Sequence, residues 1–95
     1  RAVYLDDALL VLQGQFPAAI TECRGRGFLR GVRLDETIDL AAFVKTLRDD
    51  HLLCVPAAEN TLRLLPPLTI SKDEIDLAVA KIAAVLNEIP KHDNE

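Results

Sequence analysis

Residues 60–75 read Asn-Thr-Leu-Arg-Leu-Leu-Pro-Pro-Leu-Thr-Ile-Ser-Lys-Asp-Glu-Ile, a stretch that holds a strand, an extended exit and the start of a helix. Polar and apolar residues alternate over 61–65, which predicts a strand. The two prolines at 66–67 lack a backbone donor and favour extended geometry, so the chain is expected to leave the sheet there. Ser71 and Glu74 have the spacing of a capping box, in which each side chain bonds the other residue's backbone amide. The stretch therefore predicts a strand followed closely by a capped helix.

Similar patterns recur on the N-terminal side of this stretch. Apolar spacing predicts helices over 4–13, 39–50 and 71–89, and strands over 20–24, 28–34, 52–55 and 61–65. The glycine-containing segment 24–27 favours a hairpin turn, and 56–60 favours a second turn. Gly14 is expected to end the first helix, and Thr37 or Asp39 to cap the second. The order helix, strand pair, helix, strand pair, helix predicts an α+β fold, a small and mainly antiparallel sheet with helices on one face.

The first predicted helix has two apolar faces. Leu5, Leu9 and Leu12 form a stripe on one side. Val3 and Leu10 lie on nearly the opposite side. A helix at the edge of a small domain normally presents one polar side to water, so the second face indicates a partner outside this chain. Because the first residue is an arginine rather than a methionine, we expect the chain to be processed, cleaved or cut from a longer protein.

Length and charge limit the possible classes of protein. The 95 residues suffice for one domain, which we place at residues 1–90, with a polar tail at 91–95. The net charge of −4 argues against a nucleic-acid surface or a basic membrane-binding face, and no apolar run approaches the roughly 20 residues of a membrane span. Cys23 and Cys54 fit no metal or redox spacing and are interpreted as small apolar residues of a cytosolic protein. A disulfide between them stays open.

Few residues offer catalytic chemistry. His51 ends a predicted helix, where a protonated imidazole favours the helix dipole, and His92 lies in the tail, so both are interpreted as surface residues. The segment 24–27 precedes a strand rather than the helix that a phosphate loop requires, and no H-E-x-x-H or C-x-x-C metal spacing occurs. Without interleaved aromatics, the arginines do not favour an RNA site. They are Arg24, Arg26, Arg30, Arg33 and Arg63.

Arg63 is the candidate for substrate binding. Alternation predicts that it lies on the face opposite Leu62 and Leu64. From alternation alone, a solvent-facing residue of a one-sided sheet is the commoner interpretation. The more specific interpretation is a carboxylate clamp, because a guanidinium grips a carboxylate through two hydrogen bonds.

The chain resembles class III aminotransferases over about residues 4–86, most closely the acetylornithine branch. The motifs that carry the resemblance are Cys-Arg-Gly-Arg-Gly-Phe-Leu at 23–29, Leu52-Leu53 with Pro56-Ala57, the run 60–71, and Glu74-Ile75. The resemblance implies a C-terminal small domain of a fold-type I enzyme, a cytoplasmic homodimer whose large domain, absent from this chain, carries pyridoxal phosphate on a lysine. It also implies transfer of an amino group between N-acetylornithine and 2-oxoglutarate in arginine biosynthesis.

The resemblance implies roles for single residues as well. Arg63 matches the arginine that binds a substrate carboxylate in such enzymes. None of the lysines at 45, 72, 81 and 91 has the family's cofactor-lysine context, so we expect no catalytic or cofactor-binding residue here and no activity from this chain alone. Ala58 and His51 stand where relatives usually have glycine. Asn60 is therefore expected to adopt the left-handed conformation in place of Ala58.

Two other functions remain open from the residues alone. One is a stand-alone α+β module that binds a small anion or a partner, and the other is an interaction protein whose apolar helix face docks elsewhere. The arginine beside the two prolines and the second apolar face of the first helix favour the enzyme fragment over both.

Overall fold

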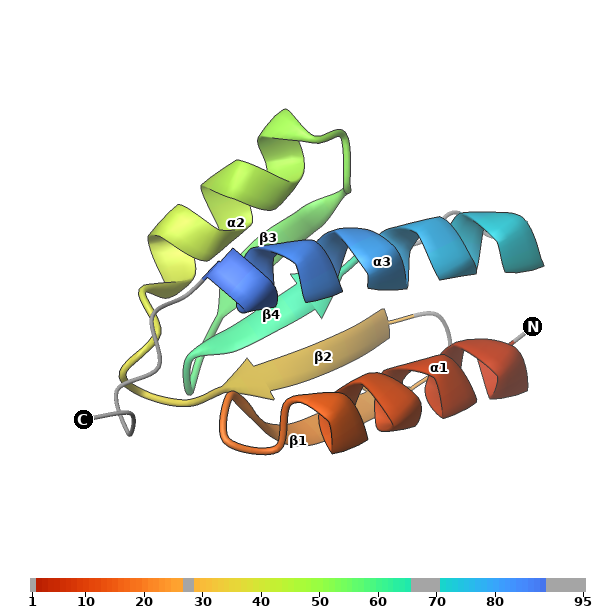
Figure 1. Cartoon of the computed structure of the whole chain (residues 1–95), viewed down its shortest axis with the longest axis horizontal. Helices are drawn as coiled ribbons and strands as arrows, with labels where there is room; N and C mark the ends of the chain where they lie inside the picture. The colour runs from red at the N-terminus through yellow and green to blue at the C-terminus, as the bar shows by residue number, and fades with distance from the viewer. Residues whose placement is uncertain (1, 27–28, 66–70, 89–95) are drawn as a thin grey trace.

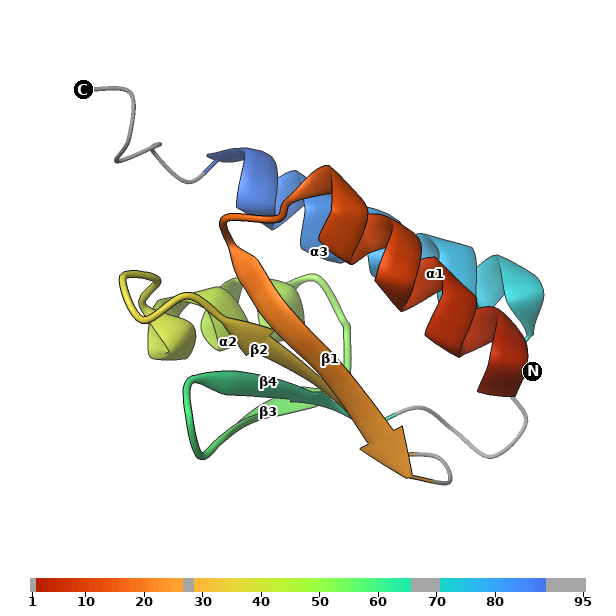
Figure 2. The ribbon, with the colours of Figure 1, turned by 90° about the horizontal axis from the view of Figure 1, so that it is seen from below.

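The computed structural model describes residues 2–26, 29–65 and 71–88 of the chain (Figure 1). The elements in this part are α1 (Ala2–Gln15), β1 (Ile20–Arg26), β2 (Leu29–Leu34), α2 (Leu40–Asp49), β3 (Cys54–Ala57), β4 (Thr61–Leu64) and α3 (Lys72–Glu88). The strands of the described residues form one antiparallel sheet in the order β1-β2-β4-β3. The helices lie together on one face of this sheet (Figure 2). The predicted α+β fold is confirmed.

The core lies between the sheet and the helices. α1 packs against β1 and α3, and α2 packs against β3 and β4. On the inner strands, Val32 pairs with Leu62, and both side chains are fully buried. The apolar stripes predicted for the helices supply the facing layer, whose most buried members are Leu5, Leu9, Leu12, Phe43, Val44, Leu47, Ile75, Ile82 and Leu86. The hydrophobic periodicity therefore predicted which side of each helix is buried.

Three predicted boundaries are wrong because strand pairing or helix bonding continues past them. β1 runs on through Gly25 and Arg26, which pair with β2 and so do not belong to the turn predicted at 24–27. β3 includes Pro56 and Ala57, so the second turn is shorter than predicted. Pro56 is tolerated because β3 is an edge strand, where a missing backbone donor costs little. α1 continues past Gly14 by one residue.

Among the described residues other than glycine, left-handed backbone conformations occur in the two connections that flank β3. His51, just after α2, has φ 66°, as a glycine at a helix end often does. In the β3–β4 turn, Glu59 and Asn60 have φ 62° and 53°. The prediction for Asn60 is confirmed, and its side-chain amide donates to the backbone oxygens of Asp35 and Ile38, at 2.8 and 3.1 Å. These two bonds anchor the turn to the segment before α2.

Both predicted caps are present. The Asp39 carboxylate accepts a hydrogen bond from the Ala42 amide at 3.2 Å and caps α2, which settles the choice between Thr37 and Asp39. At α3, the Glu74 amide donates to Ser71 Oγ at 3.1 Å, and the Ser71 amide donates to the Glu74 carboxylate at 2.8 Å. The bond from the Ser71 amide lowers the pKa of Glu74 below its usual value.

Several predictions fall on residues that lie outside the described ranges. These are Phe28, the prolines at 66–67, the end of the last helix at Ile89 and Pro90, and the polar tail at 91–95. Cys23 and Cys54 are both free thiols, so no disulfide joins them. Among the described residues, no helix combines the length and the hydropathy that a membrane span requires.

Replacing a fully buried leucine of β4 tests the core. We expect Leu62→Ala to lower the free energy of unfolding by about 2–5 kcal/mol, because it leaves a cavity between the sheet and the helices. Urea unfolding followed by circular dichroism measures the change. Leu77→Ala, at a leucine that is 56% exposed on α3, is the control and is expected to change stability by less than about 0.5 kcal/mol. Equal effects of the two changes would contradict this placement of the core.

The capping box predicts a pH dependence of stability. Because the pKa of Glu74 is lower in the folded chain, its stabilising effect is complete above the ordinary glutamate pKa of about 4.3 and is lost as pH falls through the lower folded value. Unfolding measured from about pH 7 to about pH 3 should therefore show the wild type losing its advantage over Glu74→Gln at the acidic end. Glu36→Gln, at an exposed glutamate outside the helices, controls for general charge effects. An advantage that persists unchanged at low pH would contradict the capping role of the carboxylate.

Candidate functional site

The candidate site lies on the face of the sheet that the helices leave uncovered, which we call the open face (Figure 2). Strand alternation places every second side chain there, and the pairing register arranges these residues in two rows across the strands. One row is Glu22, Arg33, Thr61 and Ala57, and the other is Arg24, Gly31, Arg63 and Val55. The described part of the open face is thus rich in arginine, although the chain as a whole is acidic.

Arg63 lies on β4 with its side chain exposed, between two buried leucines of the same strand. Its predicted orientation, away from Leu62 and Leu64, is therefore confirmed. Within the described residues, the Arg63 guanidinium makes no ion pair or side-chain hydrogen bond. Its neighbours across the sheet are Gly31 on β2 and Val55 on β3, neither of which carries a charge.

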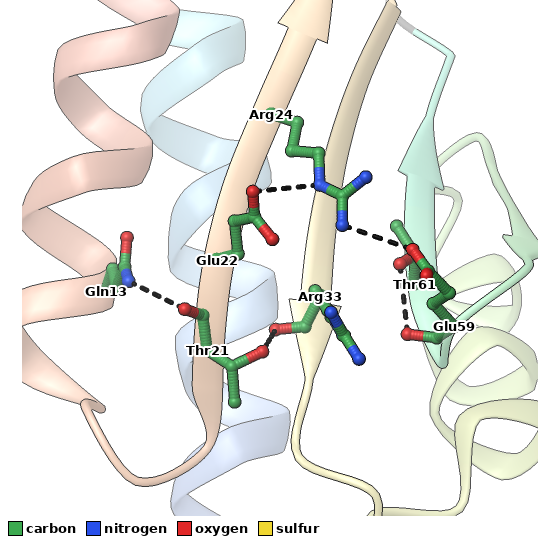
Figure 3. Close-up of polar contacts among 7 residues, drawn as sticks. All are labelled: Gln13, Thr21, Glu22, Arg24, Arg33, Glu59 and Thr61. Carbon is green, nitrogen blue, oxygen red and sulfur yellow. Dashed lines mark hydrogen bonds and ion pairs between the residues drawn. The ribbon is translucent and has the colours of Figure 1, made fainter.

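Arg24, in the same row, has two carboxylate partners. Its Nε lies 3.0 Å from Glu22 on the same strand, and its Nη2 lies 3.1 Å from Glu59 in the β3–β4 turn. Figure 3 shows the side chain reaching across β2 toward Glu59. The hydrogen bond and charge of Glu22 are the main reason why the pKa of Arg24 is raised. These pairs are about half exposed, so each contributes little to stability, but they engage the Nε and Nη2 donors of Arg24 and partly neutralise its charge.

Two threonine hydroxyls donate to backbone oxygens beside the other row of the open face (Figure 3). Thr21 Oγ1 donates to the Arg33 backbone oxygen at 3.3 Å, and Thr61 Oγ1 donates to the Glu59 backbone oxygen at 3.2 Å. The Arg33 side chain is half-buried and, like that of Arg63, has no ion-pair partner among the described residues. Arg33 thus offers a natural comparison for Arg63.

Gly31 leaves space between the two arginines of its row. A Cβ at this position would lie 3.0 Å from the methyl group of Thr61, which is closer than side chains normally approach. Thr61 is held by its bond to Glu59 and has little freedom to move away. Because Gly31 has no side chain, no atom projects from β2 directly beside Arg63 on the open face.

Arg30 was missed as a special residue by the sequence analysis. It is only 6% exposed, lies on the helix-covered face of β2, and its Nε donates to the Asp6 carboxylate of α1 at 2.5 Å. This ion pair joins the sheet to the first helix, so Arg30 has a structural partner and does not belong to the open face. The signal was present in the sequence, because Arg30 shares its alternation with Val32 and Leu34.

The described lysines all lie on the helices and have partners there. Lys45 pairs with Asp49 at 2.9 Å, Lys72 lies 5.3 Å from the centre of the Tyr4 ring, and Lys81 donates to the Asp50 backbone oxygen at 2.5 Å. All three belong to helices, which cover the opposite face of the sheet from Arg63. Among the described residues, no group of three or more metal-ligating side chains occurs.

The helix side also has an apolar surface. A cleft of about 500 Å³ lies between α1 and α3, and its lining includes Ala8, Val11, Val79 and Ala83. On the outer side of α1, Val3 and Leu10 are 72% and 58% exposed, so the second apolar face predicted for this helix is present. The partner expected to cover it stays a prediction.

Comparison with known proteins identifies relatives over nearly the whole chain. The model of the family described as Aminotransferase class-III matches residues 2–86. An acetylornithine aminotransferase of Mesorhizobium japonicum is 36% identical over 87 residues, which are 88% of this chain and 21% of that protein. An L-lysine-epsilon aminotransferase of Mycobacterium tuberculosis is 36% identical over 83 residues, which are 87% of this chain and 18% of that protein.

Solved structures agree with the sequence comparison. A lysine aminotransferase from M. tuberculosis superposes with a TM-score of 0.80 and 36% identity, over 88% of this chain and 19% of that one. The chain thus spans about one fifth of the length of the relatives that it matches. With the family match over residues 2–86, the shared sheet and the shared sequence, this chain belongs to the class III aminotransferases.

Proposed function

We propose that this chain is the C-terminal small domain of an acetylornithine aminotransferase, which transfers an amino group between N-acetylornithine and 2-oxoglutarate in arginine biosynthesis. The acetylornithine aminotransferases among its relatives support this donor. L-lysine-epsilon aminotransferases are as similar to this chain, so L-lysine is the competing amino donor. In this view the domain comprises residues 1–90, with a polar tail at 91–95.

The single observation that carries the proposal is that Arg63 lacks a carboxylate partner among the described residues. Its guanidinium is exposed on the open face and has no carboxylate partner among the described residues, whereas Arg24 has two such partners and Arg30 has Asp6. Charge-assisted bonds from a guanidinium to a carboxylate are strong and directional. Arg63 is therefore available to bind and orient a substrate carboxylate, such as that of glutamate or 2-oxoglutarate.

The reaction needs further parts that we assign to the rest of a longer protein. Pyridoxal phosphate, when bound, supplies the electron sink for moving the amino group. We place its lysine in a large domain of the same parent chain, since the described lysines are engaged elsewhere. The parent is proposed to be a cytoplasmic homodimer, and this chain alone is proposed to be inactive. Its own contribution is to hold one carboxylate of the substrate.

Substitution of Arg63 in the full-length aminotransferase tests the proposal. Arg63→Gln is expected to lower kcat/KM for 2-oxoglutarate at least about tenfold, because hydrogen bonds to charged groups contribute roughly 1.5–3 kcal/mol each. Steady-state kinetics with varied 2-oxoglutarate measures the change. Arg33→Gln is the matched control, since Arg33 lies on the same face and also has no ion-pair partner among the described residues. If both variants behave like the wild type, Arg63 does not bind the substrate carboxylate.

A further inference from the structure

Two carboxylates lie at the open face, and among the described residues neither is paired with Arg63 (Figure 3). Glu22 belongs to β1, and Glu59 belongs to the turn that leads directly into β4. Both are paired with Arg24 instead, at 3.0 and 3.1 Å. The availability of Arg63, on which the proposed function depends, therefore coincides with an arrangement that engages the carboxylates of the same face elsewhere.

The register of the sheet places Arg24 close enough to do this. Arg24 and Arg63 belong to the same row, with Gly31 between them. Neighbouring strands lie about 4.8 Å apart, so the two arginine backbones are separated by about 10 Å. Because Gly31 has no side chain, the Arg24 side chain crosses β2 and meets Glu59 from the turn before β4 (Figure 3). Its Nε contact with Glu22 orients the guanidinium in that direction.

Without Arg24, the two carboxylates would turn to the other arginines of the described open face. Glu22 lies directly across from Arg33, and opposite charges at such positions of an antiparallel pair attract each other. Glu59 lies next to β4, which carries Arg63. An exposed arginine side chain has many rotamers, so Arg63 can bend back toward this turn. Arg63 is thus the guanidinium left for Glu59 once Arg33 has taken Glu22.

We propose that Arg24 is a positioning residue of the carboxylate site, because it binds Glu22 and Glu59 and so keeps an internal carboxylate from occupying Arg63. This inference rests on the proposed binding of a substrate carboxylate by Arg63. A guanidinium grips a carboxylate through two parallel hydrogen bonds, so an internal carboxylate in that place competes directly with the substrate. The ion pairs of Arg24 are about half exposed and add little to stability, which leaves the holding of these carboxylates as their main effect.

Substitution of Arg24 in the full-length aminotransferase tests this role. Exposed ion pairs form with equilibrium constants of about 1 to 5, and an internal competitor weakens substrate binding by one plus that constant. We therefore expect Arg24→Gln to raise KM for 2-oxoglutarate about twofold to sixfold. The value of kcat should stay unchanged, because saturating substrate displaces the internal carboxylate. Steady-state kinetics with varied 2-oxoglutarate separates the two constants.

A second substitution distinguishes this role from a structural one. In Arg24→Gln/Glu59→Gln the released carboxylate is gone, so KM should return to the wild-type value. Glu59→Gln alone should not raise KM, since Arg24 still holds Glu22. If the Arg24–Glu59 pair served only the shape of the turn, both single variants would be impaired alike and the double variant would not recover. Lys45→Gln, which breaks an exposed ion pair with Asp49 on α2, is the matched control and should leave both constants unchanged.

The kinetics of Arg63→Gln separate this inference from the proposed function. If Arg63→Gln impairs the use of 2-oxoglutarate but Arg24→Gln leaves KM unchanged, the positioning role of Arg24 is overturned and the carboxylate site of Arg63 stands. A raised KM that persists in the Arg24→Gln/Glu59→Gln variant overturns the positioning role as well, since the defect then does not come from the released carboxylate. If Arg63→Gln itself behaves like the wild type, the carboxylate site fails, and the role of Arg24 fails with it.

Discussion

Burial of one face of the sheet is the constraint on which the rest of this structure depends. β2 and β4 are the inner strands, and Val32, Leu62 and Leu64 point from them into the core beneath the helices. Because strand side chains alternate, the packing that buries the two leucines of β4 also places Arg63 on the open face. A shift of β4 by one residue would bury the guanidinium and expose both leucines. The core therefore determines the orientation of the candidate binding residue.

The distribution of charge then decides which arginine is available to a ligand. Arg30 is buried and bonded to Asp6, and it ties the sheet to α1. Arg24 is shared between Glu22 and Glu59, and it ties β1 to the β3–β4 turn. Among the described residues of the open face, Arg33 and Arg63 have no such internal competitor, and Arg63 is the more exposed of the two. An incoming carboxylate thus displaces water from Arg63 rather than a carboxylate of the protein, which makes binding there less costly.

Two surfaces of the described chain expose apolar side chains, and both fit a domain of a larger enzyme. On the helix side, Val3 and Leu10 project from the outer face of α1. On the open face, Leu53 and Leu65 are exposed close to Arg63 in the β3–β4 pair. The chain spans about one fifth of the length of its relatives. In the proposed parent, the remaining residues are therefore available to pack against both surfaces.

By itself the sequence determined the features that depend on residues a few positions apart. Local spacing predicts the Ser71–Glu74 capping box, the buried apolar stripes of the helices and the orientation of the Arg63 side chain away from the core. Helix and strand periodicity alone decides which side chains share a face. Only the tertiary structure decided the strand order β1-β2-β4-β3. It also decided the ion pairs Arg30–Asp6 and Arg24–Glu59 and the backbone hydrogen bond between Leu65 and Leu53. The lengths of β1 and β3 belong to the same group, since Gly25 and Pro56 are weak strand formers that extend their strands only by pairing with a neighbour. These contacts join segments distant in the chain, and their energy is gained only when the sheet assembles, so no local pattern specifies them.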